Sequence, residues 1–106
     1  MEEALFRTML FDSYGELLTE KQREYFDLHY NEDLSLAEIA QSEGVSRQSV
    51  WDIIRRAEAA MTEIEEKTGL IKRFMERNAQ IDEIIRELRD KGADERIISE
   101  LEELKI

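Results

Sequence analysis

The sequence predicts an all-α fold, with a helix-turn-helix domain over residues 1–67 and a C-terminal amphipathic helical hairpin over residues 68–106. The 106 residues include no proline and only four glycines, and the commonest residues are mostly good helix formers. No segment shows the alternation with a period of two that a half-buried strand needs. Apolar residues recur instead at helical spacing. The length suits one helical core with an appendage rather than two ordinary domains.

The first predicted helix ends near Tyr14 and Gly15, where we expect the glycine to adopt the left-handed conformation that stops a helix. Its apolar stripe consists of Leu5, Phe6, Met9 and Leu10. Thr19 and Gln22 then form a capping box, in which each side chain satisfies a free backbone NH of the first turn. A second helix is therefore expected over residues 20–30. Its buried side is formed by Tyr25, Phe26 and Tyr30.

The stretch SLAEIAQSEGVSRQSVWDIIRRAE, residues 35–58, has the spacing of a helix-turn-helix motif. After a loop, Ser35 and Glu38 form a second capping box and start a short helix that ends near Ser42. The residues of this helix that we expect to face inward are Ile39 and Ala40. Gly44 lies where the chain must turn sharply between two helices in contact. This order of cap, short helix, glycine and second helix predicts the motif.

The second helix of the motif is expected to begin after Ser46, whose hydroxyl can cap it, while Val45 covers the crossing of the two helices with apolar surface. The inward residues of this helix are Val50, Ile53, Ile54, Ala57, Met61 and Ile64. Helical geometry then leaves six side chains to project outward, namely Arg47, Gln48, Ser49, Trp51, Asp52 and Arg55. These six form the candidate contact surface.

The final third of the chain reads as a long amphipathic helix, a break at Gly92 and a shorter helix. The apolar stripes are Ile71, Phe74, Ile81, Ile84, Ile85 and Leu88 in the first helix and Ile97, Ile98, Leu101 and Leu104 in the second. Both stripes are narrow and must be buried against another surface. Either the hairpin folds back on its own chain, or its helices form a homodimer.

The candidate nucleic-acid-binding residues lie in the first turns of the second motif helix. Arg47 and Gln48 can reach base edges, because a guanidinium matches guanine and a carboxamide matches adenine. Arg55 and Arg56 are further along, where phosphates are the more natural partners. A simpler interpretation is that these side chains are solvated or pair with nearby carboxylates. For Trp51 we favour an edge of the core or an anchor for a partner over stacking on a base.

The charge distribution limits the strength of any such contact. Residues 1–45 carry a net charge of −8, residues 46–60 a net charge of +1 and the remainder −4, which gives −11 for the chain. A duplex-binding domain usually has a basic surface. Only the segment with the candidate reading helix, residues 46–60, has no net negative charge. We therefore expect binding to duplex to be modest at physiological salt.

Other function classes find no support in the residues. The chain has no cysteine and a single histidine, His29, so we expect no metal, no cofactor, no histidine-centred triad and no enzyme. His29 is expected to be a polar tip near a helix end. The first residues, MEEALFRTMLFD, lack a basic region and a long apolar run. This indicates no secretory signal, no membrane partner and a cytoplasmic location.

The segment LTEKQREYFDLHYNEDLSLAEIAQSEGVSRQSVWDIIRRAEAAM, residues 18–61, resembles region 4 of bacterial sigma factors, a promoter-reading module of the winged-helix-like DNA-binding superfamily. A closer resemblance, over residues 10–70, is to the YlxM-like family of small helix-turn-helix proteins of Gram-positive bacteria. It rests on LLTEKQREYFDLHYNEDLSLAEIA and GVSRQSVWDIIRRAE. Similarity to sigma region 4 implies that the reading helix holds Arg47, Gln48, Ser49, Asp52, Arg55 and Arg56.

The YlxM-like resemblance implies a protein encoded beside the GTPase of the signal recognition particle and its receptor. Such a protein is expected to be an accessory or regulatory component of that pathway, with the particle's RNA, its proteins or DNA as partner. A second hypothesis is a sequence-specific DNA-binding transcriptional regulator that acts as a dimer. A third is a protein–protein adaptor without nucleic-acid binding, which the acidic charge favours.

Overall fold

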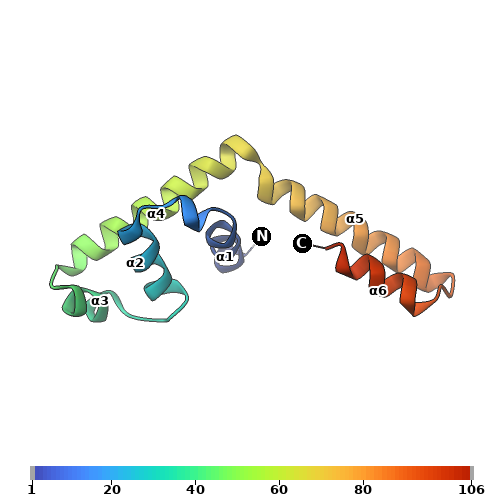
Figure 1. The fold of residues 1–106 in the computed structure, drawn as a ribbon, viewed down its shortest axis with the longest axis horizontal. Helices are drawn as coiled ribbons and strands as arrows, with labels where there is room; N and C mark the ends of the chain where they lie inside the picture. Colours follow the sequence, from blue (N-terminus) through green and yellow to red (C-terminus); the bar gives the residue numbers. More distant parts are fainter. Residues whose placement is uncertain (1, 106) are drawn as a thin grey trace. The chain divides into compact units, whose positions relative to one another are not determined.

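A computed structural model describes residues 2–105 of the chain, and that part is helical with no strand. It forms two compact units that divide after Thr68 (Figure 1). The first unit contains α1 (Glu3–Tyr14), the short 3-10 helix η1 (Gly15–Leu17), α2 (Glu20–Tyr30), α3 (Leu36–Glu43) and α4 (Arg47–Thr68). The second contains α5 (Leu70–Asp90) and α6 (Glu95–Glu103). The prediction of an all-α protein is confirmed.

Helix α4 is the axis of the first unit, because α1, α2 and α3 all pack against it (Figure 1). Its buried side chains are Val50, Ile54, Ala57 and Met61, at the spacing that places them along one face of a helix. The other helices contribute Leu10, Tyr14, Tyr25, Phe26, Ile39 and Ala40 to the same core. Ile53 and Ile64, which were also expected to face inward, are only half-buried.

Both predicted capping boxes are present and set where α2 and α3 begin. The backbone NH of Gln22 donates to Thr19 Oγ1 over 3.2 Å, and the NH of Thr19 donates to Gln22 Oε1 over 3.1 Å. In the second box the distances are 3.0 Å from the NH of Glu38 to Ser35 Oγ and 3.1 Å from the NH of Ser35 to Glu38 Oε1. These bonds satisfy backbone donors that a helix start otherwise leaves open.

Gly15 ends α1 as predicted, but the expected left-handed conformation is wrong. Its φ is −55°, in the right-handed region, and the chain continues directly into η1. Space is tight at this position: a Cβ atom would lie 3.1 Å from the Phe11 ring, which stacks on Phe26 with the ring centroids 5.2 Å apart. The glycine therefore serves a close side-chain packing rather than a backbone turn.

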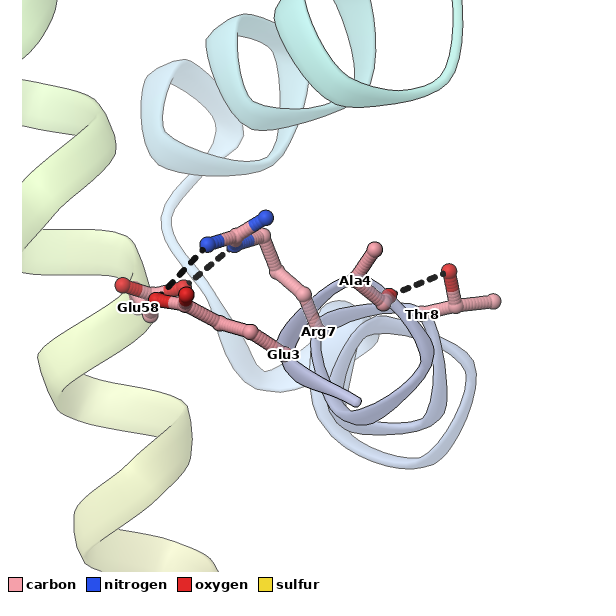
Figure 2. A network of polar contacts seen from close by, with 5 residues as sticks. All are labelled: Glu3, Ala4, Arg7, Thr8 and Glu58. Carbon is pink, nitrogen blue, oxygen red and sulfur yellow. Dashed lines mark hydrogen bonds and ion pairs between the residues drawn. The ribbon is translucent and has the colours of Figure 1, made fainter. Parts of the chain in front are cut away.

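A salt-bridge network around Arg7 joins α1 to α4 (Figure 2). Arg7 Nε donates to Glu58 Oε1 over 2.7 Å, Arg7 Nη2 lies 3.3 Å from Glu3 Oε1, and the guanidinium carbon is 4.4 Å from the centre of the Tyr30 ring. The hydrogen bond to Glu58 raises the pKa of Arg7 above its ordinary value. Arg7 thus contacts three helices of the first unit, a role that the sequence did not indicate.

In the second unit, α6 folds back along α5 after a turn at Gly92, whose φ is +71°. The buried cluster consists of Ile81, Ile85 and Ile98, with Leu88 and Leu101 partly buried against it. Three other members of the predicted stripes remain exposed, namely Ile84, Ile97 and Leu104, with 47%, 43% and 62% of their surface accessible. The helices α5 and α6 therefore bury only part of their apolar surface against each other.

Candidate nucleic-acid interface

The candidate interface lies on the helix-turn-helix formed by α3 and α4. Gly44 ends α3 in the left-handed conformation, with φ at +70°, which a side chain would strain. Ser46 caps α4 as predicted, since its Oγ accepts from the NH of Ser49 over 3.1 Å. Val45, which was expected to cover the helix crossing, has 42% of its surface exposed. The turn thus fixes the start of α4, and the backbone NH of Val45 helps to close it by donating to the carbonyl oxygen of Ala40 over 3.1 Å.

Gln48, Asp52 and Arg55 lie on the side of α4 opposite its buried face, whereas Arg47 lies in the first turn on the same stripe as Val50 and Ile54. Exposed side chains are those of Arg47, Gln48, Ser49, Arg55 and Arg56, while Asp52 is half-buried. Val50 and Ile54 on the other side are 0% and 1% exposed. Because a buried face holds the helix, the outward side chains project from a rigid support.

Three of these side chains form a polar cluster on the surface of α4, which we call the Asp52 cluster. Gln48 Nε2 donates to Asp52 Oδ1 over 3.0 Å, and Arg55 Nη2 lies 3.6 Å from the same oxygen. The spacings of four and three residues allow both contacts along a helix. This spacing is visible in the sequence and is the local signal for the cluster.

The remaining candidates differ in how they are engaged. Within residues 2–105, neither Arg47 nor Arg56 takes part in an ion pair or a side-chain hydrogen bond. Ser49 Oγ instead accepts from Ser46 Oγ over 2.9 Å, so its hydroxyl contributes to the helix cap. Trp51 is 36% exposed, and it is four residues from both Arg47 and Arg55 along the helix.

An acidic hollow lies on the same unit, between α2 and the end of α1. It has a volume of about 610 Å³, and its lining includes Phe11 and Gly15. The charged residues around it are Asp12, Glu16, Glu20, Arg23, Glu24 and Asp27. Five carboxylates beside one guanidinium repel phosphates, so the hollow disfavours any approach of a nucleic acid from this side.

The single histidine is occupied within the fold. His29 Nδ1 donates to the carbonyl oxygen of Leu34 over 2.7 Å, since a carbonyl can only accept, and the ring packs edge-on against Tyr30. This contact holds the loop between α2 and α3. Across residues 2–105, no group of three or more acidic or histidine side chains is arranged to hold a metal ion. No helix in that range has the length and apolarity to cross a membrane.

Comparison with known proteins places the chain in a family. The model of the UPF0122 family, described as "Putative helix-turn-helix protein, YlxM / p13 like", matches residues 1–103. A UPF0122 protein of Thermoanaerobacter sp. (strain X514) is 42% identical over 106 residues, covering 97% of this chain and 91% of the relative. One from Halalkalibacterium halodurans is 45% identical over 105 residues, with 98% and 95% covered. One from Clostridium kluyveri is 53% identical over 72 residues, with 68% and 65% covered. The chain therefore belongs to the UPF0122 family of YlxM- and p13-like helix-turn-helix proteins.

Proposed function

We propose that this protein is an accessory or regulatory component of the signal recognition particle pathway and that it binds nucleic acid through residues 46–56 at the start of α4. The link to the pathway rests on the resemblance to YlxM-like proteins. The binding mode rests on the helix-turn-helix geometry. The protein acts by recognition and needs no cofactor for this role.

One observation supports the binding mode most directly. Arg47 and Arg56 are exposed and have no ion-pair partner within residues 2–105, although acidic residues outnumber basic ones by 26 to 15. In so acidic a chain, the two arginines without an ion-pair partner near the start of α4 are available to external anions. Phosphates of a nucleic acid supply such anions at a regular spacing.

Two other functions remain as alternatives with different supports. A DNA-binding regulator that acts as a dimer is favoured by the exposed apolar residues of the hairpin, Ile84, Ile97 and Leu104. Association of two copies would bury them and pair two reading helices. A protein–protein adaptor is favoured by the net charge of −11 and by the exposed edge of Trp51, since tryptophan is frequent at the centres of interfaces.

The test measures binding across a range of salt concentrations. Fluorescence anisotropy with duplex DNA and with the RNA of the signal recognition particle should show an affinity that falls as salt rises. The variant Arg47→Ala/Arg56→Ala should bind at least tenfold more weakly and show a shallower dependence on salt. The control is Arg77→Ala/Arg86→Ala, which removes the same charge from exposed positions of α5 and should bind like the wild type.

The outcomes separate the three functions. Preferential binding of the particle's RNA supports the proposed role, and selective binding of duplex DNA supports the regulator. Equal weakening by both double variants would mean that total charge rather than the α4 surface governs binding, and it would contradict the proposed interface. No binding to either nucleic acid would leave the adaptor.

A further inference from the structure

The Asp52 cluster has a geometry that a solvated helix face does not require. Asp52 Oδ1 accepts from Gln48 Nε2 at 3.0 Å and lies 3.6 Å from Arg55 Nη2. The carboxylate is therefore held from two sides, one turn of helix before and one turn after. A carboxamide on a flexible side chain is thereby restrained in one orientation above the surface of α4.

The bond to Asp52 leaves Gln48 with one hydrogen-bond donor and one acceptor. A carboxamide has two N–H donors, and the contact with Asp52 uses one of them. The second N–H and Oε1 remain available on the same planar amide group. Adenine presents the complementary pair in the major groove, where N7 accepts and the N6 amino group donates.

We infer that Asp52 is a positioning residue that orients the Gln48 amide to read adenine in the major groove of duplex DNA. The inference rests on the proposed binding of nucleic acid through the start of α4, and it commits that site to B-form DNA, the ligand that favours the DNA-binding regulator among the functions considered above. The major groove of B-form DNA admits a helix, whereas that of A-form RNA is too deep and narrow for side chains to read.

The charge of Asp52 adds a second effect. A carboxylate among the reading residues repels nearby phosphates, so it weakens binding to duplex of any sequence. An orienting carboxylate at this position thus lowers general affinity while raising discrimination between sequences. The two effects have opposite signs and can be measured separately.

The experiment selects duplexes from a randomised library with the full-length chain. Wild type should enrich adenine at one position, and Gln48→Ala should abolish that preference. Asp52→Ala should reduce the preference about tenfold while binding random duplex more tightly than wild type. Asp52→Asn removes the charge but keeps an oxygen that accepts from Gln48, so most of the preference should remain.

Two controls separate positioning from charge and from folding. Glu66→Gln removes one charge from an exposed position of the same helix and should leave the adenine preference unchanged. Asp52→Ala in the Gln48→Ala background should change the base preference no further. Unaltered helical content by circular dichroism shows that each variant is folded.

Each result supports or overturns the inference. An adenine preference that Asp52→Ala leaves intact overturns the positioning role while the proposed binding surface stands. Binding of RNA alone overturns the assignment to duplex DNA, and again the surface stands. Absence of binding to any nucleic acid overturns both the inference and the proposed function.

Discussion

Arg7 illustrates how one charged side chain can connect several helices when it is largely covered. Only 19% of its side chain is exposed, and it contacts Glu58 on α4, Glu3 on its own helix and the ring of Tyr30 on α2. A fully exposed ion pair contributes little to stability, because water and salt screen it. Because Arg7 is partly buried and makes a short hydrogen bond to Glu58, we expect this contact to contribute more to stability than an exposed ion pair does.

A pair of double-mutant cycles measures that difference. Alanine substitutions of Arg7 and Glu58, singly and together, should give a coupling energy of about 1 kcal/mol. The control cycle uses Lys67 and Glu63, whose side chains are 74% and 65% exposed, and should give about 0.3 to 0.5 kcal/mol. Free energies of unfolding from urea titrations supply both values. Equal coupling in the two cycles would show that the burial of Arg7 has no effect.

Gly15 gives a second prediction at the residue scale. Its φ of −55° suits any residue, so backbone entropy alone would make Gly15→Ala stabilising. However, the added Cβ would lie 3.1 Å from the Phe11 ring, which stacks on Phe26. We therefore expect Gly15→Ala to lower the free energy of unfolding by about 1 kcal/mol. Thermal unfolding of Gly15→Ala in a Phe11→Leu background, where the ring is gone, should show no such loss relative to Phe11→Leu alone.

At the scale of the elements, local signals predicted most of the fold. The capping boxes at Thr19 and Ser35 set where α2 and α3 begin, because the hydroxyl of each cap residue accepts a hydrogen bond from the backbone NH three residues later. Such contacts span three residues, so the sequence contains all of their information. The ring packing that Gly15 serves and the ion pair between Arg7 and Glu58 join residues far apart in the chain, and periodicity cannot reveal them.

In the candidate site, too, helical spacing predicts some features and not others. Helical spacing predicted which residues of α4 face outward, because one buried stripe determines the opposite side. It did not predict that Asp52 would engage both Gln48 and Arg55, since each of these side chains has several rotamers and several carboxylates within reach. Nor did it predict the exposure of Val45, which depends on the angle at which α3 and α4 meet.

Glu38 makes the second capping box sensitive to pH. The backbone NH of Ser35 lowers the pKa of the Glu38 carboxyl below its ordinary value of 4.5. A lowered pKa in the folded state means that this contact stabilises the fold above the unfolded pKa and is lost as the pH falls through the folded one. The destabilisation caused by Glu38→Ala should therefore be constant above pH 5 and shrink below about pH 4.5.

The control for this effect is Glu38→Gln, because glutamine can accept the same hydrogen bond but does not titrate. The difference in unfolding free energy between Glu38→Gln and wild type should become smaller in acid, because the wild-type carboxyl also becomes neutral there. Unfolding free energies measured by urea denaturation from pH 3 to pH 7 test both variants. A Glu38→Ala difference that stays constant over this range would contradict the role assigned to the carboxylate.

For the whole molecule, the net charge of −11 opposes compactness, because like charges are brought closer together on folding. The acidic hollow concentrates part of this repulsion, with Glu20 and Glu24 four residues apart on α2 and Glu16 facing the same space. Salt shortens the screening length from about 30 Å at 0.01 M to about 8 Å at 0.15 M. The fold should therefore be more stable at the higher concentration.

A salt titration of stability tests this repulsion. The midpoint of thermal unfolding of the wild type should rise between 0.01 M and 0.15 M NaCl. Replacing Glu16, Glu20 and Glu24 by glutamine should raise the midpoint at low salt and reduce the gain from added salt. A matched triple variant at Glu66, Glu76 and Glu83, which are exposed outside the hollow, should have a smaller effect. Equal effects would mean that the hollow is not a focus of repulsion.

The second unit has so small a buried cluster that a single side chain should control it. Ile98 is 1% exposed and packs with Ile81 and Ile85, and truncating a buried isoleucine to alanine costs about 2 to 5 kcal/mol. We therefore expect Ile98→Ala to release α6, so that its amides lose their protection from hydrogen exchange. The neighbouring Ile97→Ala is the matched control, because 43% of Ile97 is already exposed and its loss should leave the protection nearly unchanged. Mass spectrometry of peptides covering α6 measures both variants, and persistent protection in Ile98→Ala would show that α6 is held by more than this cluster.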